Sequence, residues 1–153
     1  MTVGLLLHHD EAVAEYLFKN HVTPRMKYDG AIGIMIYGQL SGGILLQCYN
    51  GFNVEVSYYG HGTLTPGVIK CLARILASTF NVSRVTVTVS RRNRRLMRSL
   101  RRMGFSIEGV QRCFYGHKDT VRNTGVRFVM FRERVNKLCH WAPGKEVENV
   151  SVN

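Results

Sequence analysis

The 153-residue sequence lacks any apolar run near the roughly 20 residues that span a bilayer, so we expect no transmembrane helix. Its first residues lack a basic leader, and we expect no secretory signal peptide. It also lacks internal repeats and low-complexity segments. The length is typical of one domain that buries a core without metal or disulfide staples. We predict a single domain over residues 1–141 and a loosely held tail over residues 142–153.

Paired cysteines are absent. Cys48, Cys71, Cys113 and Cys139 are widely separated, and no Cys-x-x-Cys occurs. A zinc site needs clustered ligands, and a disulfide framework normally belongs to a shorter secreted chain. We therefore predict buried, reduced thiols in a cytoplasmic protein, with no metal.

Acidic residues are few. The chain has 10 Asp and Glu against 21 Lys and Arg, which gives a formal net charge of +11 and a pI near 10.0. Such a field favours anionic partners, namely nucleic acid, an acidic protein or the phosphates of a nucleotide cofactor. It carries no information about the fold.

Apolar periodicity and turn residues predict ten helices and strands. Gly38 to Gly43 has turn chemistry between two β-rich runs, Asn50-Gly51 is a tight-turn signal, and Thr65-Pro66 is a typical helix start. The predicted order is β-α-β-β-β-α-β-α-β-β, with strands at 3–7, 31–37, 44–49, 52–59, 85–89, 105–115 and 126–134, and helices at 11–22, 65–81 and 90–103. Strands that alternate with helices imply a right-handed crossover. The fold class is therefore α+β, or α/β with three layers, around a mixed sheet of about seven strands.

One stretch of the chain resembles a known family. Asn93-x-x-Leu96-x-x-x-Leu100-x-x-x-Gly104-Phe105 looks like the fourth-helix signature of the GNAT N-acetyltransferase superfamily. The continuation from Phe105 to Arg112 is similar to the GF-x-x-EG-x-x-R run of the branch that acetylates ribosomal-protein N-termini. Phage-encoded members look similar over roughly residues 65–141, about half of the chain. The resemblance implies a bacteriophage protein of the host cytoplasm or the virion.

The resemblance also implies a cofactor site for acetyl-CoA. Strands 52–59 and 85–89 should splay apart, with the pantetheine arm between them and the pyrophosphate at the start of the helix after Thr65. The sequence departs from the family here, because Leu64 and Ile69 replace the expected Arg or Gln and the second Gly, and Pro66 lacks an N–H. Gly60 and Gly62 offer a substitute nest. The implied cofactor-binding residues are Val56, Tyr58, Gly67, Val68, Asn93 and Leu100.

The family pattern places a general base on the strand at 52–59. Glu55 is the candidate, and it would take a proton from an attacking amine directly or through water. Ser57 and His61 are the second choices. Many relatives have a Tyr where this chain has Leu100, so Tyr115 becomes the candidate proton donor to the departing thiolate, with Tyr58 and Tyr59 as alternatives. Each of these residues also has a plain structural interpretation as a solvent-facing or packing side chain.

The helix at 90–103 carries an arginine face. Leu96, Met97, Leu100 and Met103 fall on the opposite face, which predicts a docked amphipathic helix. A solvated surface is one interpretation, and docking to phosphates or acidic side chains is the other. The arginines are Arg91, Arg92, Arg94, Arg95, Arg98, Arg101 and Arg102.

Three functions remain open from the sequence. The first is an acetyl-CoA-dependent N-acetyltransferase that acts on a primary amine, namely a protein N-terminus, a Lys or a small amine. The second is a catalytically impaired protein of the same fold that binds an acidic partner through its arginine face. The third is a nucleic-acid binder that relies on phosphate contacts alone and has no sequence preference.

Overall fold

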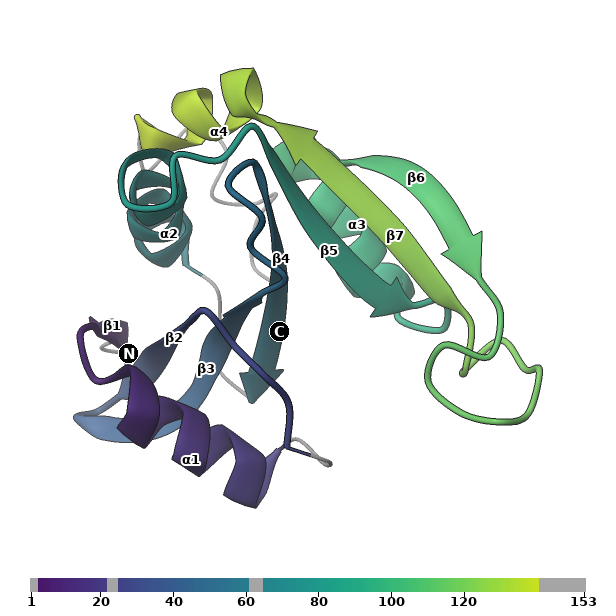
Figure 1. Cartoon of the computed structure of the whole chain (residues 1–153), viewed down its shortest axis with the longest axis horizontal. Helices are drawn as coiled ribbons and strands as arrows, with labels where there is room; N and C mark the ends of the chain where they lie inside the picture. Colours follow the sequence, from purple (N-terminus) through teal and green to yellow (C-terminus); the bar gives the residue numbers. More distant parts are fainter. Residues whose placement is uncertain (1–2, 22–24, 61–64, 141–153) are drawn as a thin grey trace.

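The computed structural model describes residues 3–21, 25–60 and 65–140. The predicted tail at 142–153, the loop glycine Gly62 and the alternative base His61 lie outside these residues. Seven strands form one sheet in the order β1-β2-β3-β4-β5-β7-β6, as Figure 1 shows. The elements are β1 (Val3–Leu6), α1 (Asp10–Asn20), β2 (Gly30–Ile36), β3 (Gln39–Gln47), β4 (Asn53–Gly60), α2 (Pro66–Ser78), β5 (Arg84–Ser90), α3 (Arg94–Met103), β6 (Ser106–Gln111), β7 (Gly125–Phe131) and α4 (Arg132–Cys139).

The predicted order of elements is confirmed up to β7, and the structure adds one helix. The last strand was predicted to reach Arg134, but it ends at Phe131, and Arg132 begins α4. Val135 and Leu138 are buried against the rest of the core, and α4 packs beside α2. This apolar face, at helical spacing, is what directs the segment into a helix.

Other boundaries also differ from the prediction. The hairpin between β2 and β3 turns at Tyr37 and Gly38, which both have positive φ, and not across Gly38 to Gly43. Positive φ at both central residues is typical of the tight turn whose twist matches antiparallel strands. The glycines after it lie inside β3, where Gly42 allows close approach: an added Cβ would lie 2.4 Å from the Tyr59 carbonyl oxygen of β4. β6 ends at Gln111, four residues before its predicted end.

The two faces of the sheet are covered differently. On one face, alternate strand residues such as Val54, Val85 and Phe128 pack under α2, α3 and α4 in the main core. On the other face, α1 buries Val13 and Leu17 against β2 and β3. Among the described residues, no helix covers this second face over β5, β6 and β7 (Figure 1). Polar side chains of these strands are therefore left accessible.

The cysteines are free, as predicted, but their burial differs. Cys139 is buried and Cys71 is half-buried, whereas Cys48 and Cys113 are exposed, so the expectation of buried thiols is wrong for these two. Within the described ranges no helix is long and apolar enough to cross a bilayer.

Candidate functional site

The centre of the sheet contains a divergence between its two parallel strands. β4 and β5 pair only through Asn53–Arg84, Val54–Val85 and Glu55–Thr86. Beyond these pairs, β4 follows its antiparallel partner β3 to Gly60, and β5 follows β7 to Ser90. Each strand therefore turns with its own partner, and Figure 1 shows the two separating toward their C-terminal ends. The predicted splay of these strands is confirmed.

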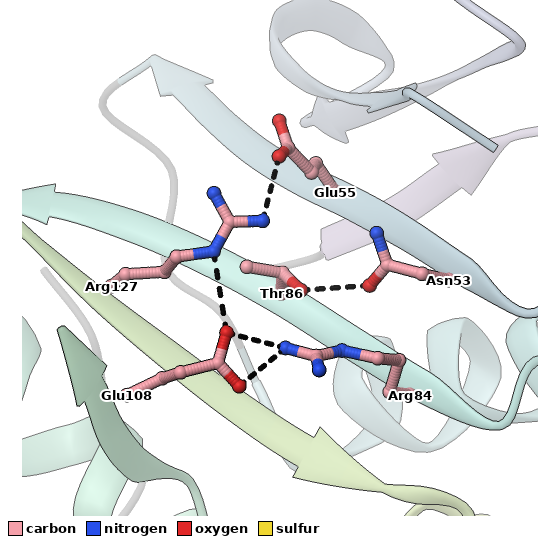
Figure 2. A network of polar contacts seen from close by, with 6 residues as sticks. All are labelled: Asn53, Glu55, Arg84, Thr86, Glu108 and Arg127. Atoms are coloured by element: carbon pink, nitrogen blue, oxygen red, sulfur yellow. Dashed lines mark hydrogen bonds and ion pairs between the residues drawn. The ribbon is translucent and has the colours of Figure 1, made fainter. Parts of the chain in front are cut away.

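Glu55 lies at the last pair before the strands part. Its neighbours Val54 and Val56 belong to the main core, so the alternation of the strand directs Glu55 to the face that α1 occupies. Its Oε1 accepts a hydrogen bond from Nη2 of Arg127 in β7 at 3.0 Å. Figure 2 shows both side chains reaching toward each other across β5. The predicted base is thus oriented by an arginine, and about a third of it, 33%, remains exposed.

The same face carries two more polar contacts (Figure 2). Arg84 donates from Nη2 to both carboxylate oxygens of Glu108, at 2.6 and 2.5 Å, and Nε of Arg127 lies 3.6 Å from Glu108. The fully buried Thr86 donates from Oγ1 to Oδ1 of Asn53 at 2.8 Å. Two guanidinium groups therefore balance two carboxylates across β4, β5, β6 and β7. We name Glu55, Arg84, Glu108 and Arg127 the ion-pair network.

An exposed thiol lies beside the network. Partial burial raises the pKa of the Cys48 thiol, and the neighbouring Glu55 carboxylate raises that pKa further. Cys48 has a positive φ of 53° at the end of β3. The carboxylate of Glu55 therefore has one strong partner, Arg127, and one weak partner, the thiol.

Two tyrosines meet beside the divergence. Tyr115, in the connection from β6 to β7, donates from its hydroxyl to the Thr88 carbonyl oxygen of β5 at 3.0 Å. Burial and, to a smaller extent, the neighbouring Tyr59 of β4 together raise the pKa of Tyr115 to about 12. Burial also raises the pKa of Tyr59, while a hydrogen bond with Ser57 opposes this. Ser57, Tyr59 and Tyr115 thus lie together, on the same face as Glu55.

Comparisons with known proteins find similarity in structure only. No protein-family model and no curated protein sequence matches this chain significantly. A chimera of the spermidine N-acetyltransferase SpeG from Vibrio cholerae with hSSAT is 11% identical, covers 89% of this chain and 99% of its own, and has a TM-score of 0.68. An acetyltransferase of the GNAT family from Streptococcus pneumoniae is 13% identical, with coverages of 85% and 99% and a TM-score of 0.64. The fold is that of the GNAT acetyltransferases.

The first turn of α2 is where the family resemblance predicts a pyrophosphate site. Thr65 caps this helix, since its Oγ1 accepts from the Val68 N–H at 3.2 Å and its carbonyl accepts from the Ile69 N–H at 3.0 Å. Pro66 has no N–H, so Gly67 supplies the remaining donor of the turn. Gly67 is exposed, and an added Cβ there would meet only Thr65, at 3.8 Å. The turn is accessible to an anion, but the residues described here offer it few donors.

The other residues that the resemblance assigned to cofactor contact lie on the core side of the sheet. Val56 is nearly buried and Tyr58 is half-buried against the main core. Leu100 of α3 is 4% exposed and belongs to that core. Asn93 caps α3, because its Oδ1 accepts from the Leu96 N–H at 3.1 Å. Contact of these four with a cofactor stays a prediction, and the cap gives Asn93 a structural role.

The arginine face of α3 is exposed, as the periodicity predicted. Leu100 and Met103 are buried, while all seven arginines are exposed. None of the seven guanidinium groups forms a hydrogen bond or ion pair with another described residue. Among all the residues that the structure describes, no group of three or more His, Cys, Asp or Glu side chains is arranged to hold a metal ion.

Proposed function

We propose that this protein is an acetyl-CoA-dependent N-acetyltransferase that acts on a primary amine, with Glu55 as the general base. The observation that carries the proposal is the position of Glu55 at the point where β4 and β5 part, in a GNAT fold. Both solved structures described above are acetyltransferases, and one is a spermidine N-acetyltransferase, which supports a primary amine as the acceptor.

Acetyl-CoA would supply an activated acetyl group as a thioester. In the proposed arrangement its pantetheine arm lies between residues 56–60 of β4 and 87–90 of β5, where the two strands lack each other as partners. The Gly67 N–H and the start of α2 face the pyrophosphate. Asn93 and the backbone of β4 orient the arm, so that the acetyl carbon lies near Glu55.

Glu55 accepts the proton of the amine as the nitrogen attacks. Arg127 contacts one carboxylate oxygen and fixes the side chain, which keeps the base in place without occupying both oxygens. The accessible face over β5, β6 and β7 gives the amine its approach. Glu108 lies on this face as a second carboxylate, and Arg84 and Arg127 balance its charge.

Tyr115 has a different role from a free acid in this proposal. A pKa of about 12 keeps its hydroxyl protonated at neutral pH, so it donates a hydrogen bond readily and gives up its proton reluctantly. In the proposed step its single O–H turns from the Thr88 carbonyl oxygen to the departing sulfur and stabilises the negative charge that develops there, and the proton that the thiolate needs comes from solvent. Tyr59, which shares a hydrogen bond with Ser57, lies near Tyr115.

The test combines calorimetric titration with acetyl-CoA and an assay of thiol release with three acceptors: spermidine, a peptide with a free N-terminus and a peptide with an internal lysine. We expect Glu55→Gln to lower turnover by about 10²- to 10⁴-fold, because a general base contributes that much, and to leave acetyl-CoA affinity unchanged. Glu133→Gln on α4, whose side chain is 88% exposed, is the matched control. Full turnover in Glu55→Gln would remove Glu55 from the mechanism.

The second candidate is a non-catalytic binding protein with the same fold. The observation that favours it is the first turn of α2, where the Thr65 cap and Pro66 leave Gly67 as the free donor. The titration decides between the two. Absence of both heat and a thermal shift at millimolar acetyl-CoA would favour the binding protein.

A further inference from the structure

A second polar region lies at the C-terminal end of β5. A pocket of about 720 Å³ is formed where the start of α3 meets the connection from β6 to β7. Its cationic side chains are Arg92, Lys118 and Arg122, and no acidic residue lines it. Its other lining residues are Ser90, Asn93, Tyr115, Thr120 and Asn123.

The three cations of this pocket have no anionic partner in the described part of the chain. Ser90 contacts Arg92 and Arg122 only through their backbone atoms, and Lys118 likewise bonds through its carbonyl oxygen. The one acidic residue of the connection, Asp119, is paired with Arg112. The pocket therefore presents three unpaired positive charges beside amide and hydroxyl groups, which suit the oxygens of a phosphate.

The pocket is continuous with the arginine face along the chain. Arg92 lines the pocket, and Arg94, Arg95, Arg98, Arg101 and Arg102 follow on α3, all exposed and unpaired within the described residues. Ten residues of α helix span about 15 Å. The positive surface is therefore long enough to follow several successive phosphates of one strand.

Tyr115 lines the pocket, and the exposed ring of Phe114 packs against the Tyr115 ring. Phe114 is 48% exposed and Tyr115 is 47% exposed. Their ring centroids are 4.8 Å apart, and the rings meet edge to face. An acidic polypeptide would need the cations but would gain little from exposed rings. Exposed aromatic rings beside a positively charged surface are instead typical of proteins that stack unpaired bases.

We infer that this surface, the pocket together with the arginine face, binds single-stranded nucleic acid without sequence preference. Phosphates occupy the pocket and follow α3, and a base stacks on Phe114. The surface shares Ser90, Asn93 and Tyr115 with the proposed acetyl-CoA site, but the variants that test it leave these three residues and Glu55 unchanged. Loss of oligonucleotide binding and loss of acetyl transfer are therefore measured separately.

The test measures binding of a labelled oligothymidylate of about 16 nucleotides across a series of salt concentrations. For single strands the logarithm of the affinity falls with the logarithm of salt concentration by about 0.7 for each phosphate contacted. In the triple variant Arg94→Gln, Arg98→Gln and Arg101→Gln we expect a slope shallower by about 2, and binding about 100-fold weaker at about 0.1 M salt. Glutamine retains high helix propensity, so α3 should persist.

A charge-matched control separates the surface from the overall field. The triple variant Lys19→Gln, Lys27→Gln and Lys137→Gln removes the same three charges, from +11 to +8, at other exposed positions. It should keep the wild-type slope. Equal losses in both triple variants would overturn the inference, because binding would then follow net charge alone.

Phe114→Leu tests the stacking step. It retains apolar bulk and removes the ring, so we expect about tenfold weaker binding with an unchanged salt slope. A poly-glutamate peptide of matched length provides the comparison with an acidic protein. If poly-glutamate binds as tightly as the oligonucleotide and Phe114→Leu binds both like the wild type, the surface is a site for acidic polypeptides and the inference is wrong.

Discussion

Single residues near the β4–β5 divergence owe their chemistry to neighbours that are remote in the sequence. Glu55 and Arg127 are 72 positions apart, and Arg84 and Glu108 are 24 apart. Alternation along each strand predicts which face a side chain occupies, and it placed Glu55 opposite the apolar residues of its strand. It does not predict which strand lies alongside, so Arg127 and Glu108 were absent from the predicted site.

The raised pKa of Tyr115 predicts how stability changes at alkaline pH. Its folded-state pKa of about 12 lies above the ordinary value of 10.0, so the neutral phenol contributes stability below pH 10 that is lost as the pH rises toward 12. In Tyr115→Phe this contribution is absent. We expect the free energy of unfolding, from urea titrations at successive pH values, to fall less steeply between pH 10 and 12 than in the wild type.

The control for this experiment is Tyr37→Phe. Tyr37 is 72% exposed and lies in the turn between β2 and β3. Its substitution should leave the alkaline slope as in the wild type. If both variants give the same slope, Tyr115 is not the group whose ionisation destabilises the fold.

Elements were predictable where strong local signals mark both ends. Thr65-Pro66 marks the start of α2, and Asn93 and Gly104 bracket α3, where Gly104 has the left-handed φ of 107° that ends a helix. The failures lie where tertiary packing decides. Residues 132–139 follow a strand with no turn residue between them, and their apolar face is buried only because α4 packs beside α2. The glycines of β3 resembled a turn, but Gly42 lies against the backbone of β4 and Gly43 against that of β2, which leaves no room for a side chain at either position.

Asn93 at the start of α3 has two roles that can be tested separately: it caps the helix, and it is proposed to contact the cofactor. Asn93→Ala removes the acceptor of the Leu96 N–H and should cost about 1 kcal/mol of stability. Asn93→Ser replaces one good capping residue by another and should retain most of the stability that the cap provides. Urea unfolding measures both.

The same two variants separate the cap from the cofactor contact. If Asn93 contacts the pantetheine arm, acetyl-CoA affinity should fall in Asn93→Ser although stability does not. An affinity that falls only in Asn93→Ala, together with stability, would leave Asn93 with the structural role alone.

The whole molecule carries a net charge of +11, and a large share of it lies on one short helix. Like charges one helical turn apart destabilise a helix by about 0.2–0.5 kcal/mol for each pair. Arg94 and Arg98 form such a pair, and Arg98 and Arg102 form another. Within the described residues no acidic side chain offsets them. The surface proposed to bind nucleic acid is therefore also a source of instability in the free protein.

This cost predicts a dependence of stability on ionic strength. Raising the salt concentration from about 0.01 to 0.15 M shortens the screening length from about 30 to 8 Å, so the thermal midpoint of the wild type should rise. The variant Arg94→Gln, Arg98→Gln and Arg101→Gln should have a higher midpoint than the wild type at low salt, by about 2–4 °C, and a shallower rise.

The lysine triple variant removes as much charge from scattered positions and should gain less. A lower midpoint in the arginine variant at low salt would mean that these side chains stabilise the fold. Weakened oligonucleotide binding with a raised midpoint would instead separate the two properties, since the arginines would then be retained for a partner at the expense of stability.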